Sequence, residues 1–250
     1  MHLKTLQLHG FKSFSDETLL EFSPGLTAIV GFNGCGKSNL SDAIRWGLGH
    51  EMADVLFNGS DCREASSFAG ARLTFGNCRK GFHAGYFPGM NLPGEEVTVM
   101  RRLGRTGDEL YRLNDVSCDR EAIQELFRGT GTSDSPCFIS GRDELEDIFT
   151  FTPADSSLIF DAFADFMVNP SSIFCVLDGM DAGLNDLEFP RFRKMLKHLL
   201  CHMQVVLIPC DNQTIEFADV IYEVEMKERG VSAIRKCGST VPVQVCANGA

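Results

Sequence analysis

The residues best suited to chemistry form a glycine-rich run near the N-terminus. The run reads Gly31-Phe32-Asn33-Gly34-Cys35-Gly36-Lys37-Ser38 and fits the spacing G-x-x-x-x-G-K-[ST]. Glycines let the backbone curl so that successive N–H groups face phosphate oxygens, and the N-terminus of a following helix strengthens the attraction. The lysine would reach the β- and γ-phosphates, and the serine hydroxyl would bind magnesium. The run therefore predicts a P-loop that binds a nucleotide with Mg²⁺.

A second candidate is the acid that a P-loop needs on the metal side. The run Phe174-Cys175-Val176-Leu177-Asp178 has four apolar residues followed by an aspartate. Many buried strands end in aspartate, so this pattern alone says little. Together with the P-loop it favours a magnesium role for Asp178.

The predicted elements place both candidates at strand ends. Residues 26–30 form a short apolar run typical of a buried strand, and residues 37–48 carry Leu40, Ile44 and Leu48 at helical spacing. Further along the chain the patterns predict a hairpin, a short helix and then an alternation of strands and helices. The segments concerned are VTVMRRLGRT with ELYRLN, DREAIQELF, and residues 158–168, 173–178, 191–203 and 204–209. This order indicates an α/β sheet. Residues 81–94 and the last dozen residues are expected to be loops.

Composition narrows the class of protein. The 250 residues have 44% hydrophobic residues, a formal net charge of -11 and a mean hydropathy of -0.04, as in soluble globular proteins. No apolar run reaches the roughly 18 residues of a membrane span, and no signal peptide is evident, so we expect a cytoplasmic protein without a membrane partner. The excess of acidic over basic residues argues against a protein that binds nucleic acid through a generally basic surface, but it allows a local basic patch. The ten cysteines have no C-x-x-C spacing, which favours reduced thiols.

Eight blocks of the sequence resemble the ATPase head of the structural maintenance of chromosomes (SMC) family, in the RecF/RecN/SMC group. They are LQLHGFKSF, GLTAIVGFNGCGKSNLSDAIRWGLG, LFNGSDCRE, VTVMRRLGR, YRLNDVSC, IQELFRGTG, FCVLDGMDAGL and TIEFADVIYEVEM. The resemblance implies an α/β fold of the ABC-ATPase head type, with two lobes on one mixed sheet system. The N-lobe would span residues 1–148 and the C-lobe residues 149–235, followed by a tail at 236–250, and both lobes together would make one head domain.

The same resemblance implies ATP and Mg²⁺ as ligands and assigns their binding residues. The nucleotide would contact Lys12, Asn33, Gly34, Cys35, Gly36, Lys37, Ser38 and Asn39, and the metal would contact Ser38 and Asp178. Arg63 falls in a loop that the family places beside nucleotide and DNA. For Lys12, an ordinary solvated lysine is an equally good interpretation.

The departures from the family concern its arms and its catalytic groups. The coiled coil and hinge that separate the two lobes in the family have no room between Ile148 and Ser156. Gly179 stands where the family has a catalytic glutamate, and Cys210 where it has the switch histidine. FTFTP at 149–153 replaces the signature motif, and the Q-loop glutamine is absent at Gly141-Arg142. Phe32 replaces the usual proline. We therefore expect nucleotide binding to persist and hydrolysis to be slow or absent.

Several functions fit this pattern. The main hypothesis is an ATP-binding, SMC-like head linked to chromosome maintenance, segregation or DNA repair, in the cytoplasm or on the chromosome. The alternatives are a pseudo-ATPase that docks on a full-length SMC head or its accessory subunits, and a truncated remnant without activity. A P-loop small-molecule kinase has no support from the eight blocks.

Two further groups of residues give weaker predictions. DNA contact would use Arg101, Arg102 and Arg105, for which a solvated strand face is the competing interpretation. A zinc site at His198 and His202 lacks a third ligand.

Overall fold

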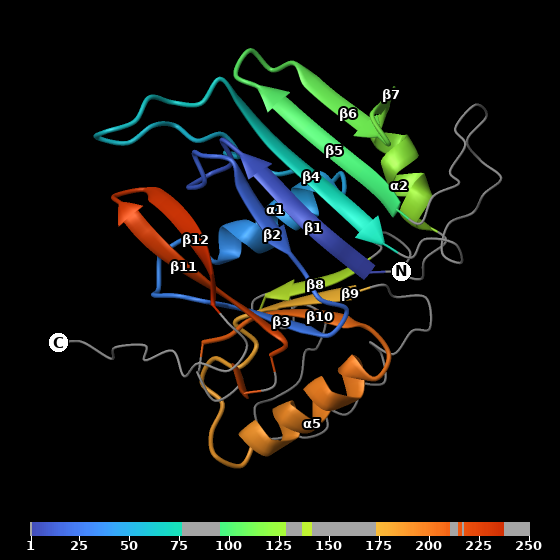
Figure 1. Cartoon of the computed structure of the whole chain (residues 1–250), viewed down its shortest axis with the longest axis vertical. Coiled ribbons are helices and arrows are strands. Elements are labelled where there is room, and N and C mark those ends of the chain that lie inside the picture. The colour runs from blue at the N-terminus through green and yellow to red at the C-terminus, as the bar shows by residue number, and fades with distance from the viewer. Residues whose placement is uncertain are drawn as a thin grey trace.

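The strands of the described residues fall into two sheets of six. The computed structural model describes residues 2–76, 96–128, 137–141, 174–210, 215–216 and 218–237. The first sheet has the order β2-β1-β4-β5-β6-β7 and is antiparallel, and the second has the order β12-β11-β3-β10-β9-β8 and is mixed. The α/β head fold expected from the sequence is confirmed, and its strands divide between these two sheets (Figure 1).

The first sheet collects the N-terminal strands. They are β1 (His2–His9), β2 (Thr18–Glu21), β4 (Phe68–Gly76), β5 (Glu96–Gly104), β6 (Glu109–Leu113) and β7 (Val116–Cys118). Alternate side chains of β4 are buried, so one face of the sheet meets the core and the other lies toward solvent. The predicted β5–β6 hairpin is confirmed. A two-residue turn joins β6 to β7, with Asn114 and Asp115 both at positive φ, as a tight hairpin turn requires.

The second sheet joins the two ends of the chain. It contains β3 (Leu26–Val30), β8 (Cys137–Gly141), β9 (Phe174–Asp178), β10 (Gln204–Ile208), β11 (Val220–Glu228) and β12 (Val231–Cys237). Every residue of β3 and β10 is buried, because the sheet is covered on both faces. β3 lies between β10 and β11 and is parallel to both, so the P-loop strand is held by C-terminal strands.

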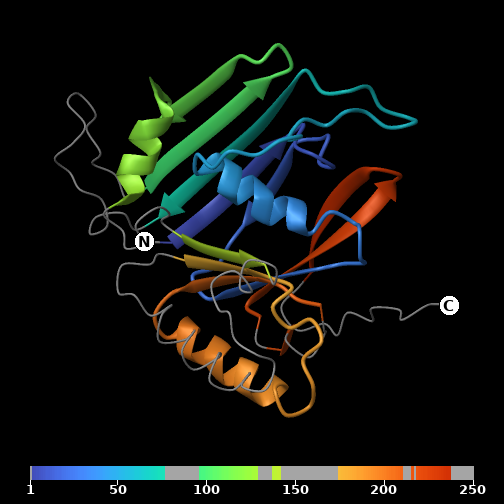
Figure 2. The same ribbon diagram turned by 180° about the vertical axis from the view of Figure 1, so that it is seen from behind.

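Helices fill the space beside the sheets. The three described helices are α1 (Ser38–Gly47), α2 (Arg120–Arg128) and α5 (Phe189–Leu200). Helix α1 lies between the two sheets, and its Leu40, Ile44 and Trp46 join the main core together with side chains of both (Figure 2). Helix α5 covers the opposite face of the second sheet through Phe192, Leu196 and a second cluster of buried residues. The helices predicted at 37–48, at DREAIQELF and at 191–203 are thus confirmed within a few residues.

Some predictions failed or fall outside the described residues. The sequence patterns gave no strand for β4 or for the β11–β12 hairpin, and the structure has all three. The helix predicted at 158–168 and the loops predicted at 81–94 and in the last dozen residues lie outside the described residues. Among the helices of the described part of the chain, none is long and apolar enough to cross a membrane.

Candidate nucleotide-binding site

The P-loop connects the buried end of β3 to the first turn of α1. Gly31, Gly34 and Gly36 have φ values of 150°, 81° and 103°, in the left-handed region that favours glycine. The Lys37 ammonium donates hydrogen bonds to the carbonyl oxygens of Gly31, at 2.7 Å, and Phe32, at 3.0 Å. The loop therefore curls around the lysine amine, and the positive charge lies beside the N-terminus of α1, an arrangement suited to an anion.

The two ends of the loop are packed so closely that only glycine fits. A Cβ on Gly31 would lie 2.3 Å from the carbonyl oxygen of Val224 in β11, and one on Gly36 would lie 2.3 Å from Ser232 Oγ in β12. A Cβ on Gly34, at the outer part of the loop, would meet nothing within 4 Å. The β11–β12 hairpin thus supports the loop at Gly31 and Gly36, while the space around Gly34 is open.

A half-buried carboxylate lies at the base of the loop. Asp178 ends β9, and its Oδ2 accepts a hydrogen bond of 2.9 Å from Ser41 Oγ in α1. Ser38, the last residue of the loop, also lies beside this carboxyl group and interacts with it. Burial raises the pKa of Asp178 above its usual value, and the two serines and the Lys37 charge partly offset the effect. The hydroxyl and the carboxylate offer the hard oxygen ligands that Mg²⁺ prefers, so these residues fit the expected metal.

Two more predicted contacts, Lys12 and Asn39, lie next to the loop. Lys12 follows β1, has a φ of 48°, and forms an ion pair with Asp42 of α1. Its side chain is half-buried, which is not the solvated lysine of the competing interpretation. Asn39 Nδ2 donates a hydrogen bond of 2.7 Å to Ser13 Oγ, so its amide is held by the loop after β1. Both residues are close to the P-loop, although their polar groups have partners within the protein.

The positions that depart from the family meet at the same edge of the sheet. Gly179 follows Asp178 with a φ of 68°, and a Cβ placed on it would lie 3.7 Å from Cys210 Sγ. The Cys210 amide donates to Asp181 Oδ1 at 2.7 Å. Gly141, at the end of β8, pairs in register with Asp178. Three of the altered positions therefore surround the end of β9, whereas Arg142 and the segment 149–153 lie outside the described residues.

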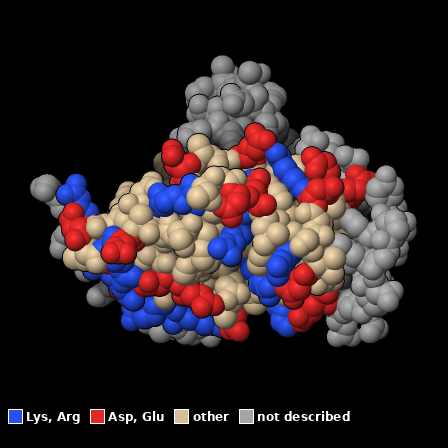
Figure 3. Space-filling model, turned by 90° about the horizontal axis from the view of Figure 1, so that it is seen from above, with Lys and Arg blue, Asp and Glu red and all other residues tan. Residues whose placement is uncertain are grey.

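The arginines proposed as phosphate contacts have partners within the protein instead. Arg101 is 5% exposed, and its guanidinium donates to Glu109 and to the carbonyl oxygens of Trp46 and His50. Arg105 donates to the carbonyl oxygens of Ser66 and Phe57 and to Asn58, and the Arg102 guanidinium lies 3.9 Å from the centre of the Phe68 ring. For Arg101 both the phosphate contact and the solvated face were wrong predictions, because the surrounding rings and carbonyl groups bury it. Seen from above, Lys and Arg side chains lie among Asp and Glu side chains (Figure 3).

Arg63 joins two segments beside the site. Its guanidinium donates to Asp16 and Ser15, in the loop after β1, and to Glu228 at the end of β11. The Arg63 charge lowers the pKa of the Asp16 carboxyl. Its described contacts are therefore with the protein itself.

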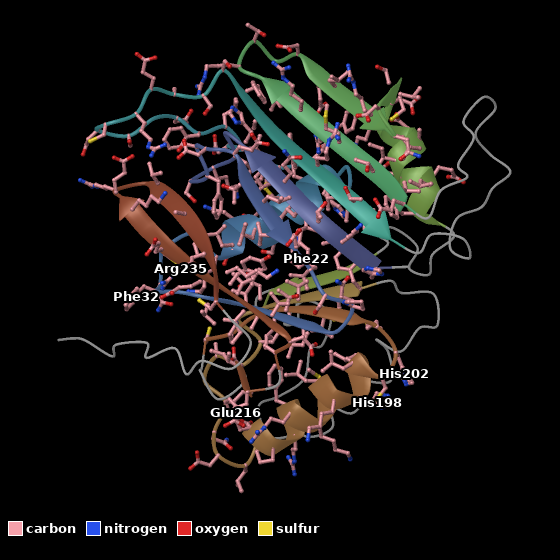
Figure 4. The ribbon with its side chains drawn as sticks, in the orientation of Figure 1. Phe22, Phe32, His198, His202, Glu216 and Arg235 are labelled. Carbon is pink, nitrogen blue, oxygen red and sulfur yellow. The ribbon has the colours of Figure 1, made fainter. Side chains whose placement is uncertain are left out.

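The two histidines of the zinc hypothesis lie at the C-terminal end of α5, far from the P-loop (Figure 4). Their ring centres are 4.9 Å apart. In the part of the chain that the structure describes, no group of three or more potential ligands could hold a metal ion. The zinc site accordingly receives no support.

Sequence reasoning missed the residues that support the loop. Ser41 lies three residues after Ser38, on the same side of α1, and helical spacing could have identified it. Ser13 and Ser232 lie 219 residues apart in the sequence, and no local pattern connects them.

Known proteins are similar to this chain in sequence and in fold. Residues 2–233 match the RecF/RecN/SMC N terminal domain. The chromosome partition protein Smc of Clostridium kluyveri is 37% identical over 173 residues, which cover 66% of this chain and 14% of that protein. The Smc of Mycolicibacterium paratuberculosis is 33% identical over 213 residues, covering 80% of this chain and 17% of that protein. The chain thus spans about a sixth or less of these relatives.

Solved structures extend the likeness to the fold. The SMC head domain from Thermotoga maritima aligns with a TM-score of 0.71 and 30% identity, covering 95% of this chain and 99% of that one. A Smc head bound to the C-winged helix domain of ScpA aligns with a TM-score of 0.76 at 21% identity, covering 95% and 98%. The sheet order, the P-loop between β3 and α1 and these matches together lead to one conclusion: the chain belongs to the RecF/RecN/SMC family and has the fold of an SMC head.

Proposed function

We propose that this protein is an SMC-like head that binds ATP with Mg²⁺ and hydrolyses it very slowly or not at all. Its setting would be chromosome maintenance, segregation or DNA repair, since its relatives include chromosome partition proteins. One observation carries the proposal. The Asp178 carboxylate lies at the P-loop, where it accepts a hydrogen bond from Ser41 of α1 and interacts with Ser38, yet the next residue is Gly179, which has no side chain.

Binding is supported by the residues that would hold the nucleotide. Lys37 and the backbone of Asn33–Ser38 would contact the phosphates, and Lys12 and Asn39 would border them. Ser38 and Asp178 would hold the magnesium ion, whose charge neutralises that of the phosphate groups when it is bound. A cation would also relieve the cost of keeping the Asp178 carboxylate charged, because burial is what raises its pKa.

Slow hydrolysis follows from what these side chains cannot do. A water molecule attacking phosphorus needs a group that orients it and accepts its proton, and Gly179 offers none. The Cys210 thiol is a weak hydrogen-bond donor that reaches less far than an imidazole. Catalytic groups act together, and losing one of them can slow phosphoryl transfer by about three or more powers of ten. The residues that would bind the nucleotide are still present, so we expect ATP to bind even though its hydrolysis is slow or absent.

Calorimetry with a matched lysine control tests this proposal. We expect ATP to bind at one site per chain, more tightly with Mg²⁺ than with EDTA, and Lys37→Ala to abolish the heat of binding. Lys194→Ala removes an exposed lysine of α5, away from the P-loop, and should bind ATP like the wild type. Unchanged binding by Lys37→Ala would reject the P-loop as the site. Steady-state phosphate release that disappears in Lys37→Ala would instead reject slow hydrolysis.

A second candidate function is docking on an SMC-type head or an accessory subunit. It is favoured by the fold match to a Smc head that was solved in complex with a domain of ScpA. In this case ATP would stabilise an interface rather than drive a cycle. Co-purification with a full-length Smc and with a ScpA-type subunit, with and without ATP, tests it. Failure to bind either partner at micromolar concentrations would leave the nucleotide-binding proposal standing alone.

A further inference from the structure

A chain of hydrogen-bonded side chains connects the P-loop to the β11–β12 hairpin. Asn39, in the first turn of α1, donates from Nδ2 to Ser13 Oγ at 2.7 Å. Ser13 Oγ lies 2.6 Å from Ser232 Oγ at the start of β12. Ser232 Oγ lies 2.5 Å from the carbonyl oxygen of Cys35, in the middle of the loop. The chain thus begins and ends on residues of the nucleotide site and passes through two that belong to other elements.

The Ser232 hydroxyl is the link between the two serines and the loop. Ser232 Oγ is placed to donate both to Ser13 Oγ and to the Cys35 carbonyl oxygen, and its single hydrogen serves one of these acceptors at a time. Ser13 in turn accepts from the Asn39 amide. A backbone hydrogen bond of 2.8 Å from the Ser232 amide to the Ser13 carbonyl oxygen fixes the spacing of the two serines. Both hydroxyls therefore have partners within the protein, and Ser232 is buried at 6% exposure, where losing a partner is costly.

Two other contacts tie the same segments together. Gly36 faces the two serines so closely that a Cβ would lie 2.3 Å from Ser232 Oγ and 2.6 Å from Ser13 Oγ. Arg63 joins Asp16, in the loop that also contains Ser13, to Glu228 on the hairpin. Residues outside the P-loop therefore help to hold its conformation. None of these contacts requires a bound nucleotide.

We propose that Ser13 and Ser232 are positioning residues, through which the β11–β12 hairpin sets the shape of the phosphate-binding loop. They act through the Cys35 carbonyl group and the Asn39 side chain, and they do not contact the nucleotide themselves. This inference rests on the proposed function, because it concerns the same site. It makes the phosphate affinity of an N-terminal loop depend on a hydroxyl of the C-terminal hairpin.

Ser232→Ala and Ser13→Ala test the inference, with ATP and inorganic tripolyphosphate as separate probes. Tripolyphosphate has phosphates but no base, so it reports on the loop alone. We expect each variant to bind both probes about five- to tenfold more weakly, the change that corresponds to the loss of one hydrogen bond. The double variant should lose less than the product of the two single losses, because both changes break the same chain. Thr98→Val is the control, since it removes one hydroxyl from a Thr74–Thr98 pair on the first sheet, and it should bind like the wild type.

The outcomes separate this inference from the proposed function. If the wild type binds neither probe, both are wrong. If the wild type binds and Ser232→Ala binds equally well, only the positioning role is wrong. A loss of ATP affinity with unchanged tripolyphosphate affinity also rejects it, because the hydroxyl would then act on another part of the nucleotide. Ser13 is only half-buried, so Ser13→Ala provides the same test if Ser232→Ala fails to fold.

Discussion

The two P-loop glycines Gly36 and Gly34 offer a matched pair of alanine substitutions. Both have left-handed φ values, 103° and 81°, so each alanine costs about 1–2 kcal/mol in backbone strain. A Cβ at Gly34 would meet nothing within 4 Å, so backbone strain is the whole cost of Gly34→Ala. Around Gly36 the Cβ would lie 2.3 Å from Ser232 Oγ, so the serine must move and break its hydrogen bonds. At about 0.5–1.5 kcal/mol for each of two bonds, Gly36→Ala should cost about 2–5 kcal/mol in total.

Urea unfolding followed by circular dichroism measures this difference in the free energy of unfolding. We expect Gly36→Ala to be less stable than Gly34→Ala by about 1–3 kcal/mol, the part of the cost that comes from the displaced serine. Adding Ser232→Ala to Gly36→Ala removes the closest collision, so the pair should be non-additive and no less stable than Gly36→Ala alone. Equal stabilities of the two glycine variants, or additive losses in the double variant, would refute the close packing between the hairpin and the loop.

Three further predictions concern the carboxylate, the altered catalytic positions and the buried arginine. Because burial raises the pKa of Asp178, the folded state holds this proton more tightly than the unfolded state, and ionisation of the group costs stability as the pH rises through the folded pKa. Asp178→Asn should therefore have a higher Tm than the wild type at pH 8, and the difference in Tm should narrow toward pH 4. The same variant should lose Mg²⁺-dependent ATP binding. A lower Tm than the wild type at pH 8 would contradict the effect of burial. The double variant Gly179→Glu with Cys210→His should not release phosphate faster than the Lys37→Ala background. The glutamate should lower the free energy of unfolding by about 1–2 kcal/mol, because φ is 68° at this position. Robust turnover would instead show that these two positions alone limit hydrolysis. Arg101→Ala should destabilise the protein by about 3–5 kcal/mol, because it leaves Glu109 and two carbonyl groups without their donor. Arg102→Ala should destabilise it by less than about 1 kcal/mol. Equal changes in Tm for the two variants would contradict the difference in burial between these arginines.

Local patterns predicted the part of the site that is local in the sequence. The strand at 26–30, the glycine spacing and the following helix all lie within about twenty residues, and the structure has β3, the P-loop and α1 there. Asp178 was identified because it follows four apolar residues in a chain that also has a P-loop. The β11–β12 hairpin was missed because its charged residues, such as Glu223 and Arg235, interrupt the apolar run that would have indicated a strand.

The failures share a different cause, which is contact between residues far apart in the chain. Arg101 looks exposed in a charged strand, and only its placement against Trp46 and His50, more than fifty residues earlier, buries it. The support that Ser232 gives to Cys35 spans 197 residues. Such contacts depend on which strands become neighbours, and hydrophobic spacing does not determine this.

The place of β3 between β10 and β11 constrains how the protein is made. A ribosome releases residues 26–30 long before residues 204–208 and 220–228, which form the two neighbours of this strand. Until then an apolar strand lacks partners on both sides, and such edges attract other chains. Completion of the second sheet must therefore await the C-terminal strands. A chain halted before residue 204 should have no ordered P-loop, whatever its N-terminal sequence encodes.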